Sequence, residues 1–536
     1  MIAATPTRYS FLLKLAGAAL LVALADLLFW FQNVGSTLGL FAMAMLTVLG
    51  SMRTEIFRRW PSRLAFAGAL FFASALSFDR SLLAVVLFWT AITLVTLLPR
   101  AAGFDNGLRW ALRLVVHGLC SPFGPLRDLL LARRAKHRHG KIGITRHALV
   151  LVVPAIGSAL FLFLFAQANP LIEQAFARID LRLEPSVETI FRTIFWGVIF
   201  LAAWSLLRPT RFALPASLGH LAPPLLPGLG LASVTASLLA FNAVFALQNG
   251  LDLAFLWSGA ALPEGMTLAE YAHRGAYPLI VTALLAGLFV LVALRPGSET
   301  AGARPVRLLV TLWIGQNLLL VASTMLRTFD YIEVYSLTRL RIAALIWMAL
   351  VAVGLILICY RLLRGKSGAW LINANLLAAL LVLGACTFVD LGRTAAAWNV
   401  RHAREVGGAG ARIDLCYLRQ LGSSALLPLL ELETRPLPAE LRPRVRWVRT
   451  QVMNDVRAGQ SDWHGWTARD ALRLAKAEAI AAERRLPAYR GPDRTCDGNI
   501  YVPPPPLEAV PMRNASPAAS PPPPSPAKPL TAAPAR

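Results

Sequence analysis

Repeated apolar stretches, several of them close to twenty residues long, constrain this chain more than any other feature of its sequence. A helix of about twenty apolar residues spans a hydrocarbon core about 30 Å thick. The chain has 536 residues, of which 56% are hydrophobic and only 15% are charged. Soluble domains carry roughly a quarter charged residues. The sequence therefore predicts an all-α, polytopic bundle of transmembrane helices.

The apolar stretches predict about eleven membrane spans. The first stretch lacks a small-residue cleavage site after it, so we interpret it as a retained signal anchor. An odd number of spans places the two termini on opposite sides of the membrane. The expected spans lie near residues 11–31, 34–50, 64–78, 82–98, 148–168, 191–207, 229–249, 276–294, 308–326, 342–360 and 370–390.

Charge is distributed unevenly among the loops between these spans. The formal net charge is +24, a value that could indicate nucleic-acid binding. However, twenty-four Arg and Lys residues fall in or beside alternate loops, including the N-terminal segment, and the loops on the other side before residue 391 hold seven. Cytoplasmic loops of membrane proteins retain positive charge in this way. The pattern places the N-terminus in the cytoplasm and the C-terminus outside, and it explains the basicity without nucleic acid.

The largest cytoplasmic loop is predicted to be residues 99–147. Its segment GLRWALRLVVHGL (107–119) places Arg109, Arg113 and His117 at helical spacing, and the basic cluster RRAKHRHGK (133–141) follows. A helix with one basic and one apolar face tends to lie in the headgroup plane, where anionic lipids attract basic clusters. We expect this loop to contact anionic headgroups, and docking of an acidic protein partner is the alternative.

The chain changes character after the last span. Residues 392–501 mix charges with helical apolar periodicity and predict a small helical domain outside the cytoplasm. Cys416 and Cys496 lie in this region, where an oxidising periplasm would favour a disulfide between them, and two free thiols are the alternative. The expected organisation is four spans (1–98), the basic loop (99–147), seven spans (148–391), the outer domain (392–501) and a Pro/Ala-rich disordered tail (502–536).

A charged tract interrupts two long apolar stretches at residues 262–279, LPEGMTLAEYAHRGAYPL. Thr267 and Glu270 have the spacing of a capping box that begins a helix, and Glu270 and Arg274 can pair on one helical face beside His273. The Glu270-x-x-His273 spacing resembles half of a di-iron helix, but such a site needs a second copy and further glutamates. We therefore predict neither a metal site nor a cofactor.

The same tract carries a family resemblance. It is similar to the signature of a bacterial family of multi-pass membrane proteins, domain-of-unknown-function family 4173. The blocks FDYIEVYSLTRLRIAALIWM (329–348), WNVRHAREVGGAGARIDLCYLRQLG (398–422) and DWHGWTARDA (462–471) resemble the same family, which gives a resemblance over roughly residues 240–490. It implies the class of membrane protein and no assigned reaction or ligand.

A second charged and aromatic tract, YIEVYSLTRLR (331–341), precedes the tenth span and faces the same side as residues 262–274 on this topology. The two tracts could form one polar site at the outer mouth of the bundle. Interfacial anchoring with mutual ion pairing is the alternative. The candidate outer-face residues are Glu264, Glu270, His273, Arg274, Asp330, Tyr331, Glu333 and Arg339.

Polar side chains are few inside the spans. Asp26 lies toward the outer end of the first span, where it can reach water, and the remaining polar groups are mostly amides. Amides can join helices through hydrogen bonds or line a solute cavity. The candidate cavity residues, from spans seven, nine and eleven, are Asn242, Gln316, Asn317, Asn373 and Asn375.

Three function classes stay open on the sequence. The favoured hypothesis is a non-enzymatic sensor or scaffold of the bacterial inner membrane, because the chain carries mass outside, a basic surface inside and few charges within the membrane. The amides favour a transporter of a small polar solute as the alternative. An envelope-modifying enzyme is weaker and rests only on the outer polar tracts.

Overall fold

The computed structural model describes residues 7–101, 104–128, 186–209, 230–257, 302–496 and 499–501, together with the single positions 158, 285 and 289. Within these residues the secondary structure is helical, and one isolated β-bridge joins Arg494 and Ile500. The all-α class predicted from the sequence is confirmed for this part of the chain.

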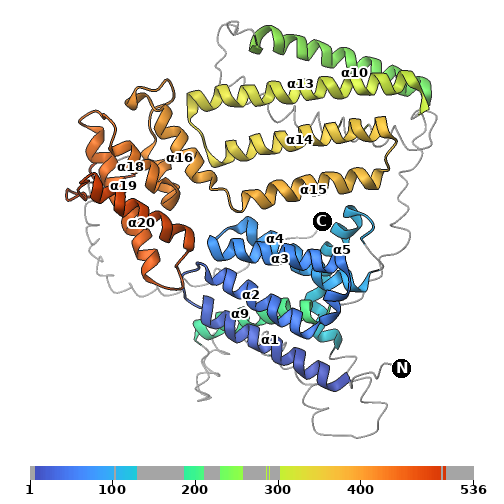
Figure 1. Cartoon of the computed structure of the whole chain (residues 1–536), viewed down its shortest axis with the longest axis horizontal. Coiled ribbons are helices and arrows are strands. Elements are labelled where there is room, and N and C mark those ends of the chain that lie inside the picture. Colours follow the sequence, from blue (N-terminus) through green and yellow to red (C-terminus); the bar gives the residue numbers. More distant parts are fainter. Residues whose placement is uncertain are drawn as a thin grey trace, which may run out of the picture.

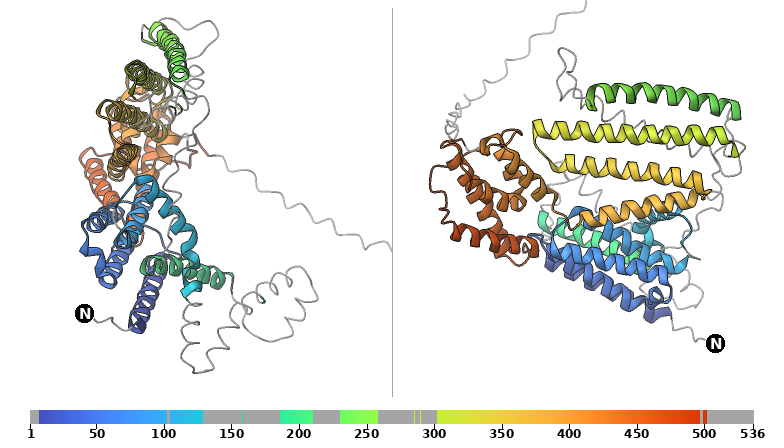
Figure 2. Two further views of the ribbon diagram at one scale, coloured as in Figure 1. Left: turned by 90° about the vertical axis from the view of Figure 1, so that its right-hand side faces the viewer. Right: turned by 45° about the horizontal axis from the view of Figure 1, so that its top comes forward.

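Long helices with nearly parallel axes form the bundle, and a group of shorter helices lies at one end of it (Figure 1). The bundle consists of α1 (Thr7–Phe29), α2 (Thr37–Met52), α3 (Trp60–Phe78), α4 (Leu82–Leu97), α9 (Val187–Leu207), α10 (Leu231–Asp252), α13 (Arg304–Tyr335), α14 (Arg339–Arg364) and α15 (Gly368–Cys386). The shorter α5 (Gly107–Cys120) lies across the end of the bundle opposite the group of shorter helices (Figures 1 and 2). Short 3-10 turns at Thr54–Arg58, Leu98–Arg100 and Ser121–Phe123 and a π turn at Leu253–Trp257 follow α2, α4, α5 and α10.

Eight of the described helices are long and apolar enough to cross a membrane, which supports an integral membrane protein. Each coincides with one of the eleven expected spans. The expected span 34–50 is α2, whose 16 residues are shorter than a full membrane crossing. The expected spans 148–168 and 276–294 lie outside the described residues. The described residues therefore supply eight candidate spans, and two of the eleven expected spans fall outside them.

The bundle helices pack against one another in sequence from α10 to α1, and α9 lies beside α1, α2 and α4 (Figures 1 and 2). Helices α10, α13, α14 and α15 follow one another, and α15 packs against α4 and α5. Beyond α4, the helices α3, α2 and α1 pack in turn, with α9 against α1. Gly39 of α2 allows the close approach to α3, because a Cβ at this position would overlap the backbone of Ser77.

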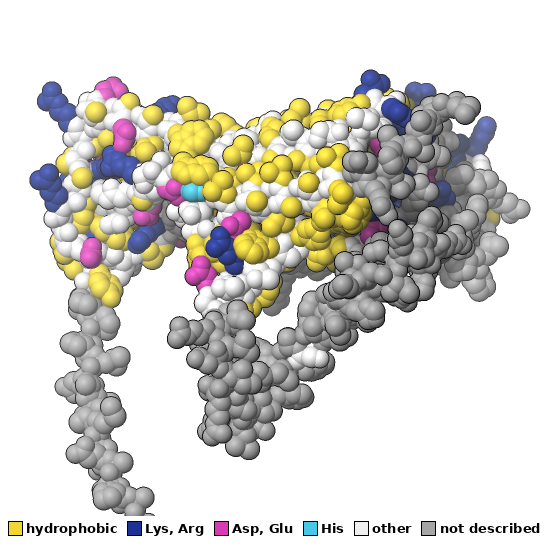
Figure 3. Space-filling model, turned by 90° about the horizontal axis from the view of Figure 1, so that it is seen from below, with side chains coloured by type: hydrophobic (Ala, Val, Ile, Leu, Met, Phe, Trp, Pro, Cys, Tyr) yellow, Lys and Arg dark blue, Asp and Glu magenta, His cyan; other side chains and the backbone are white. Residues whose placement is uncertain are grey.

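The outer surface of the bundle is apolar between its two ends (Figure 3). In α14 and α15 only 11% of the most apolar stretch is buried inside the protein, so few of their leucines and isoleucines are fully covered by other parts of the chain. In water such a surface would favour aggregation, whereas lipid tails are as apolar as these side chains.

A C-terminal helical cluster lies at one end of the bundle. It consists of α16 (Leu391–His402), α17 (Leu415–Gln420), α18 (Leu426–Glu433), α19 (Leu441–Ser461) and α20 (Ala468–Glu483), with 3-10 turns at Arg404–Val406 and Gly422–Ala425. The cluster has its own core around Leu426, Leu429, Leu430, Val445 and Val448.

Arginines at the opposite end of the bundle, the basic end, bind carbonyl oxygens that helix C-termini leave unpaired. Arg53 donates to the Leu206 oxygen of α9, and Arg307 of α13 donates to the Leu362 oxygen of α14, at 3.3 and 3.2 Å. A cation at a helix C-terminus also interacts favourably with the helix dipole. These arginines therefore hold adjacent helices together as well as carrying the positive charge of the loops.

Candidate functional site

Four connections of the bundle meet the C-terminal helical cluster: α1–α2, α3–α4, α13–α14 and α15–α16. In the first, the Ser36 nitrogen donates to the Trp466 carbonyl at 2.8 Å. In the third, the Asn399 side chain binds both the nitrogen and the oxygen of Leu337, at 2.7 and 3.0 Å. The cluster is thus fixed to several bundle helices at once.

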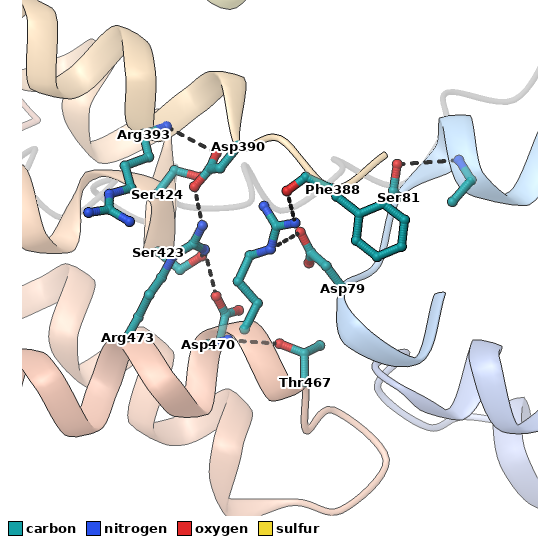
Figure 4. A network of polar contacts seen from close by, with 12 residues as sticks. Asp79, Ser81, Phe388, Asp390, Arg393, Ser423, Ser424, Thr467, Asp470 and Arg473 are labelled. Carbon is teal, nitrogen blue, oxygen red and sulfur yellow. Dashed lines mark hydrogen bonds and ion pairs between the residues drawn. The ribbon is translucent and has the colours of Figure 1, made fainter. Parts of the chain in front are cut away.

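The second and fourth connections carry carboxylates that bind two arginines of α20. Arg469 forms an ion pair with Asp79 at the end of α3, with Nε and Oδ2 3.1 Å apart. The same guanidinium donates to the carbonyl of Phe388, just after α15, at 2.8 Å. One side chain therefore joins the ends of two membrane helices (Figure 4).

Arg473 lies one helical turn after Arg469 and binds the residue that begins α16. Its guanidinium pairs with Asp390, and it also donates to Asp470 and to the Ser423 hydroxyl, both at 2.8 Å. Asp390 in turn caps α16 by accepting from the Arg393 nitrogen at 3.0 Å. We call Asp79, Asp390, Arg469, Asp470 and Arg473 the junction network.

The junction network is built by local sequence. Thr467 caps α20 by accepting from the Asp470 nitrogen at 3.2 Å, as a capping box predicts. The Asp470 carboxylate turns to Arg473 one turn later, which fixes the direction of that guanidinium. The i, i+4 spacing of Arg469 and Arg473 then places both cations on the face of α20 that meets the bundle.

Three carboxylates and two guanidinium groups share this partly buried space, so their charges are coupled. Burial raises the pKa of Asp79 above its ordinary value, and Asp470 and Asp390 add to this, while Arg469 and Arg473 oppose it. The junction network is chemically suited to linking the C-terminal helical cluster to the bundle.

The residues 330–339 of the predicted outer-face site are divided between two surroundings. Glu333 lines a cavity of about 110 Å³ with Ser336, Trp398, His402 and Gly410. Tyr331 stacks on Tyr335 and lies under the Arg341 guanidinium, 4.4 Å from the ring centre. Arg339 turns the other way and donates to Leu421 O and Ser424 in the cluster, at 3.3 and 3.4 Å.

The cavity beside Glu333 ends at a strained residue. Ser336, between α13 and α14, has φ +67°, a value that side chains disfavour. Asp330 is on α13, which continues to Tyr335 instead of ending near 326 as expected. The other members of the predicted site, Glu264, Glu270, His273 and Arg274, lie outside the described residues.

The intramembrane amides separate into two groups. Gln316 donates to Asn242 at 2.8 Å, which joins α13 to α10, and Asn317 donates to Trp313 O of its own helix. Asn373 of α15 instead accepts from the Gly107 nitrogen at 2.8 Å, which caps α5. Asn375 binds Leu371 O within α15. Because α14 stands between α13 and α15, these residues are not brought into one cavity.

Sequence reasoning missed a buried ion pair next to these amides. Asp252 of α10 pairs with Arg327 of α13, and their side chains are 1% and 6% exposed. Both lie just beyond the expected spans 229–249 and 308–326, so they were assigned to loops. The apolar residues on both sides of each, FALQNGLDLAFLW and STMLRTF, were the available signal.

Other predicted features are placed as follows. Asp26 does not reach outward alone: it accepts from Arg192 and Trp196 of α9. Cys416 and Cys496 are joined by a disulfide, with Cα atoms 4.7 Å apart. Among the described residues, no group of three or more His, Cys, Asp or Glu side chains could hold a metal ion.

One family matches residues 64–432, and its description is a domain of unknown function (DUF4153). The chain belongs to this family. The family number expected from the resemblance, 4173, is therefore wrong, although an uncharacterised family was predicted. The match to DUF4153 begins in α3 and ends in α18, so it contains Asp79 and Asp390 but not the two arginines of α20. No curated protein and no solved structure gives a significant match.

Proposed function

We propose that this DUF4153 protein is a non-enzymatic sensor or scaffold of the bacterial inner membrane. Its N-terminus would be cytoplasmic and its C-terminal helical cluster periplasmic. In this proposal the cluster binds an envelope partner and transmits that binding to the membrane helices. The observation that carries the proposal is the pair Arg469 and Arg473, through which one helix of the cluster holds the ends of α3 and α15.

The physical argument rests on the rigidity of α20. Both arginines project from one helical turn, so a rotation or displacement of α20 moves Asp79 and Asp390 together or breaks both ion pairs. Either change alters the positions of α3 and α15 relative to each other. In this proposal the joint has two arrangements, one with both ion pairs formed and one with both broken, because coupling between distant sites requires an element with two discrete states.

Charge and cysteine chemistry support the proposed orientation. Within the bundle, Arg and Lys side chains lie at the end away from the cluster, as expected for a cytoplasmic end, although the cluster carries arginines of its own (Figure 3). The disulfide lies in the cluster, and disulfides persist in oxidising compartments such as the periplasm. Arg109 and Arg113 of α5 both pair with Asp105 and are partly exposed at the basic end, where anionic headgroups are the expected further partners.

The test is a charge swap at the junction. In full-length protein in nanodiscs, spin labels on α3 and α20 report their separation, and co-purification from native membranes reports a partner. Asp79→Arg alone and Arg469→Asp alone should widen the distance distribution and change the amount of co-purified partner. The double swap should restore both. Arg457→Asp with Glu478→Arg is the matched control, because that ion pair is exposed.

Two results would overturn the proposal. One is an unchanged distance and an unchanged partner in both single variants. The other is co-purification of the same partner with a chain ending at residue 391, since the cluster would then have no role in binding it.

The buried pair of Asp252 and Arg327 favours a transporter of a small polar solute as a second candidate function. Buried ionisable groups within a membrane mark ion or substrate pathways more often than they mark structural contacts. Here they adjoin the hydrogen-bonded Asn242 and Gln316 between α10 and α13. In proteoliposomes, Gln316→Leu should abolish solute flux while Asn375→Leu leaves it unchanged. Equal flux in the wild type, Gln316→Leu and Asn375→Leu would exclude a transporter function.

A further inference from the structure

A cavity of about 500 Å³ lies between α4, α5 and α9, away from the junction network. Its volume falls within the range of roughly 300–1,000 Å³ that is typical of small-molecule sites. Most of its lining is apolar, with Trp89, Leu114, Val198 and Leu201 among the lining residues. The helices α4 and α9 are candidate membrane spans, so the cavity lies where a membrane lipid can reach it.

One buried imidazole lines this cavity without a hydrogen-bond partner. His117 is only 5% exposed, and neither of its ring nitrogens has a hydrogen-bond partner in the described part of the protein. Burial, and then the nearby charge of Arg100, lower the pKa of His117. A neutral imidazole carries one N–H donor and one acceptor. A buried polar group of this kind is costly unless something binds it.

The hydroxyl groups of the cavity already use their protons. Thr90 donates to Val86 O, Thr93 to Trp89 O and Ser205 to Ala202 O, at 2.8, 2.7 and 2.7 Å. Their oxygen lone pairs are then acceptors at the cavity wall. The residues that line the cavity include no Asp, Glu, Lys or Arg. A charged ligand would therefore lose its hydration without gaining a counter-charge, whereas a hydroxyl group could both donate and accept.

We propose that this cavity binds an uncharged lipid that carries a free hydroxyl group and one aliphatic chain, as a monoacylglycerol does. The hydroxyl group would hydrogen-bond to His117 and to the lone pairs of the threonine and serine oxygens. The aliphatic chain would lie along Val198 and Leu201 of α9. A lipid of this class partitions into the hydrocarbon layer that surrounds α4 and α9, and the site is independent of the proposed sensor function.

The test uses a monoacylglycerol with a diazirine in its acyl chain, incorporated into nanodiscs with the full-length protein. After illumination, mass spectrometry locates the labelled peptides. We expect the label on the peptides of α4 and α9 that line the cavity. His117→Phe keeps the volume but removes both ring nitrogens, and it should lower labelling about ten-fold, as expected for one lost hydrogen bond of about 1.4 kcal/mol.

Filling the cavity provides a second variant. Ala202 lines the cavity, so Ala202→Trp should abolish labelling of these peptides, and Leu201→Trp replaces it if that variant does not fold. Arg109→Gln, on the exposed side of α5, is the matched control and should label like the wild type. Unlabelled monoacylglycerol should compete, whereas a fatty acid anion and an alkyl ammonium of the same length should not.

Three outcomes would overturn the proposal. They are equal labelling of wild type and the filled variant, equal labelling of wild type and His117→Phe, and equal competition by all three amphiphiles. The last result would show that the probe detects general lipid contact instead of a site with hydrogen-bond selectivity.

Discussion

Arg469 and Arg473 lie one turn apart on α20 and bind two carboxylates, Asp79 and Asp390, that are more than three hundred residues apart in the chain. The first carboxylate ends α3 and the second begins α16, so a single helical turn joins the two halves of the bundle (Figure 4). Exposed ion pairs contribute little to stability, but these arginine side chains are largely buried and form a network. The position of the C-terminal helical cluster is therefore specified by a few named contacts.

The first prediction concerns the backbone contact at the α1–α2 connection. A Cβ at Gly35 would overlap the Trp466 carbonyl and the Gly465 backbone, which cannot easily move aside. We expect Gly35→Ala to separate this loop from the cluster and to lower the thermal unfolding midpoint. In Gly68→Ala of α3 the new methyl group meets no atom within 4 Å, so that variant should keep the wild-type midpoint. An identical midpoint in both variants would contradict the proposed contact.

The second prediction concerns the buried ion pair inside the cluster. The Arg449 and Glu433 side chains are 3% and 1% exposed, and Arg449 also donates to Pro487 O at 2.6 Å. Arg449→Met should lower the free energy of unfolding of the cluster by about 2 kcal/mol, because Glu433 keeps its ion pair with Arg446 but loses the buried guanidinium, and Pro487 O loses its donor. The matched exposed pair, Arg457 with Glu478, predicts a loss below about 1 kcal/mol for Arg457→Met. Hydrogen-exchange protection of α18 and α19 measures both, and equal losses would contradict the argument.

The sequence was sufficient to predict the long apolar helices, because their length and hydropathy are local properties. All eight candidate spans of the described chain coincide with expected segments. Their ends were less predictable: α13 continues nine residues past 326, since Asp330 and Glu333 are tolerated where the helix meets the cluster and leaves the apolar layer. The helix α19 was not predicted either, although Val445, Val448 and Val452 recur at helical spacing.

The candidate site was harder to predict than the helices. The Thr467-x-x-Asp470 spacing is typical of a helix start, and Thr467 caps α20 in the structure. Their neighbours Arg469 and Arg473 gave no signal, because their partners are Asp79 and Asp390, and only the tertiary arrangement brings these together. His117 was assigned to a basic helical face with Arg109 and Arg113, whereas its side chain is buried toward α4 and α9. Packing against α4 and α9, which the sequence does not reveal, decides which face of α5 is covered.

The third prediction concerns the disulfide between Cys416 and Cys496. It joins the start of α17 to the segment after α20, across 80 residues of sequence. Cys416→Ser should lower the free energy of unfolding of the cluster by about 2–4 kcal/mol, because the unfolded chain gains conformational freedom. Reductant should lower the thermal midpoint of the wild type to that of the variant, and it should not affect the variant. A wild-type midpoint that is insensitive to reductant would show that the bond contributes no stability.

The fourth prediction follows from the burial of His117. Burial holds the pKa of His117 below its ordinary value of 6.5, so between that lowered pKa and 6.5 the unfolded chain binds more protons than the folded chain. The free energy of unfolding should therefore fall as the pH decreases through this window, by at most about 1.4 kcal/mol per pH unit. In His117→Phe this contribution disappears, and the difference in thermal midpoint between pH 7.5 and pH 5 should shrink. His402→Phe, at an exposed position of α16, is the control and should keep the wild-type difference. If His117→Phe keeps it as well, the imidazole of His117 is reached by protons in the folded protein, and the cavity beside it is not sealed against charge.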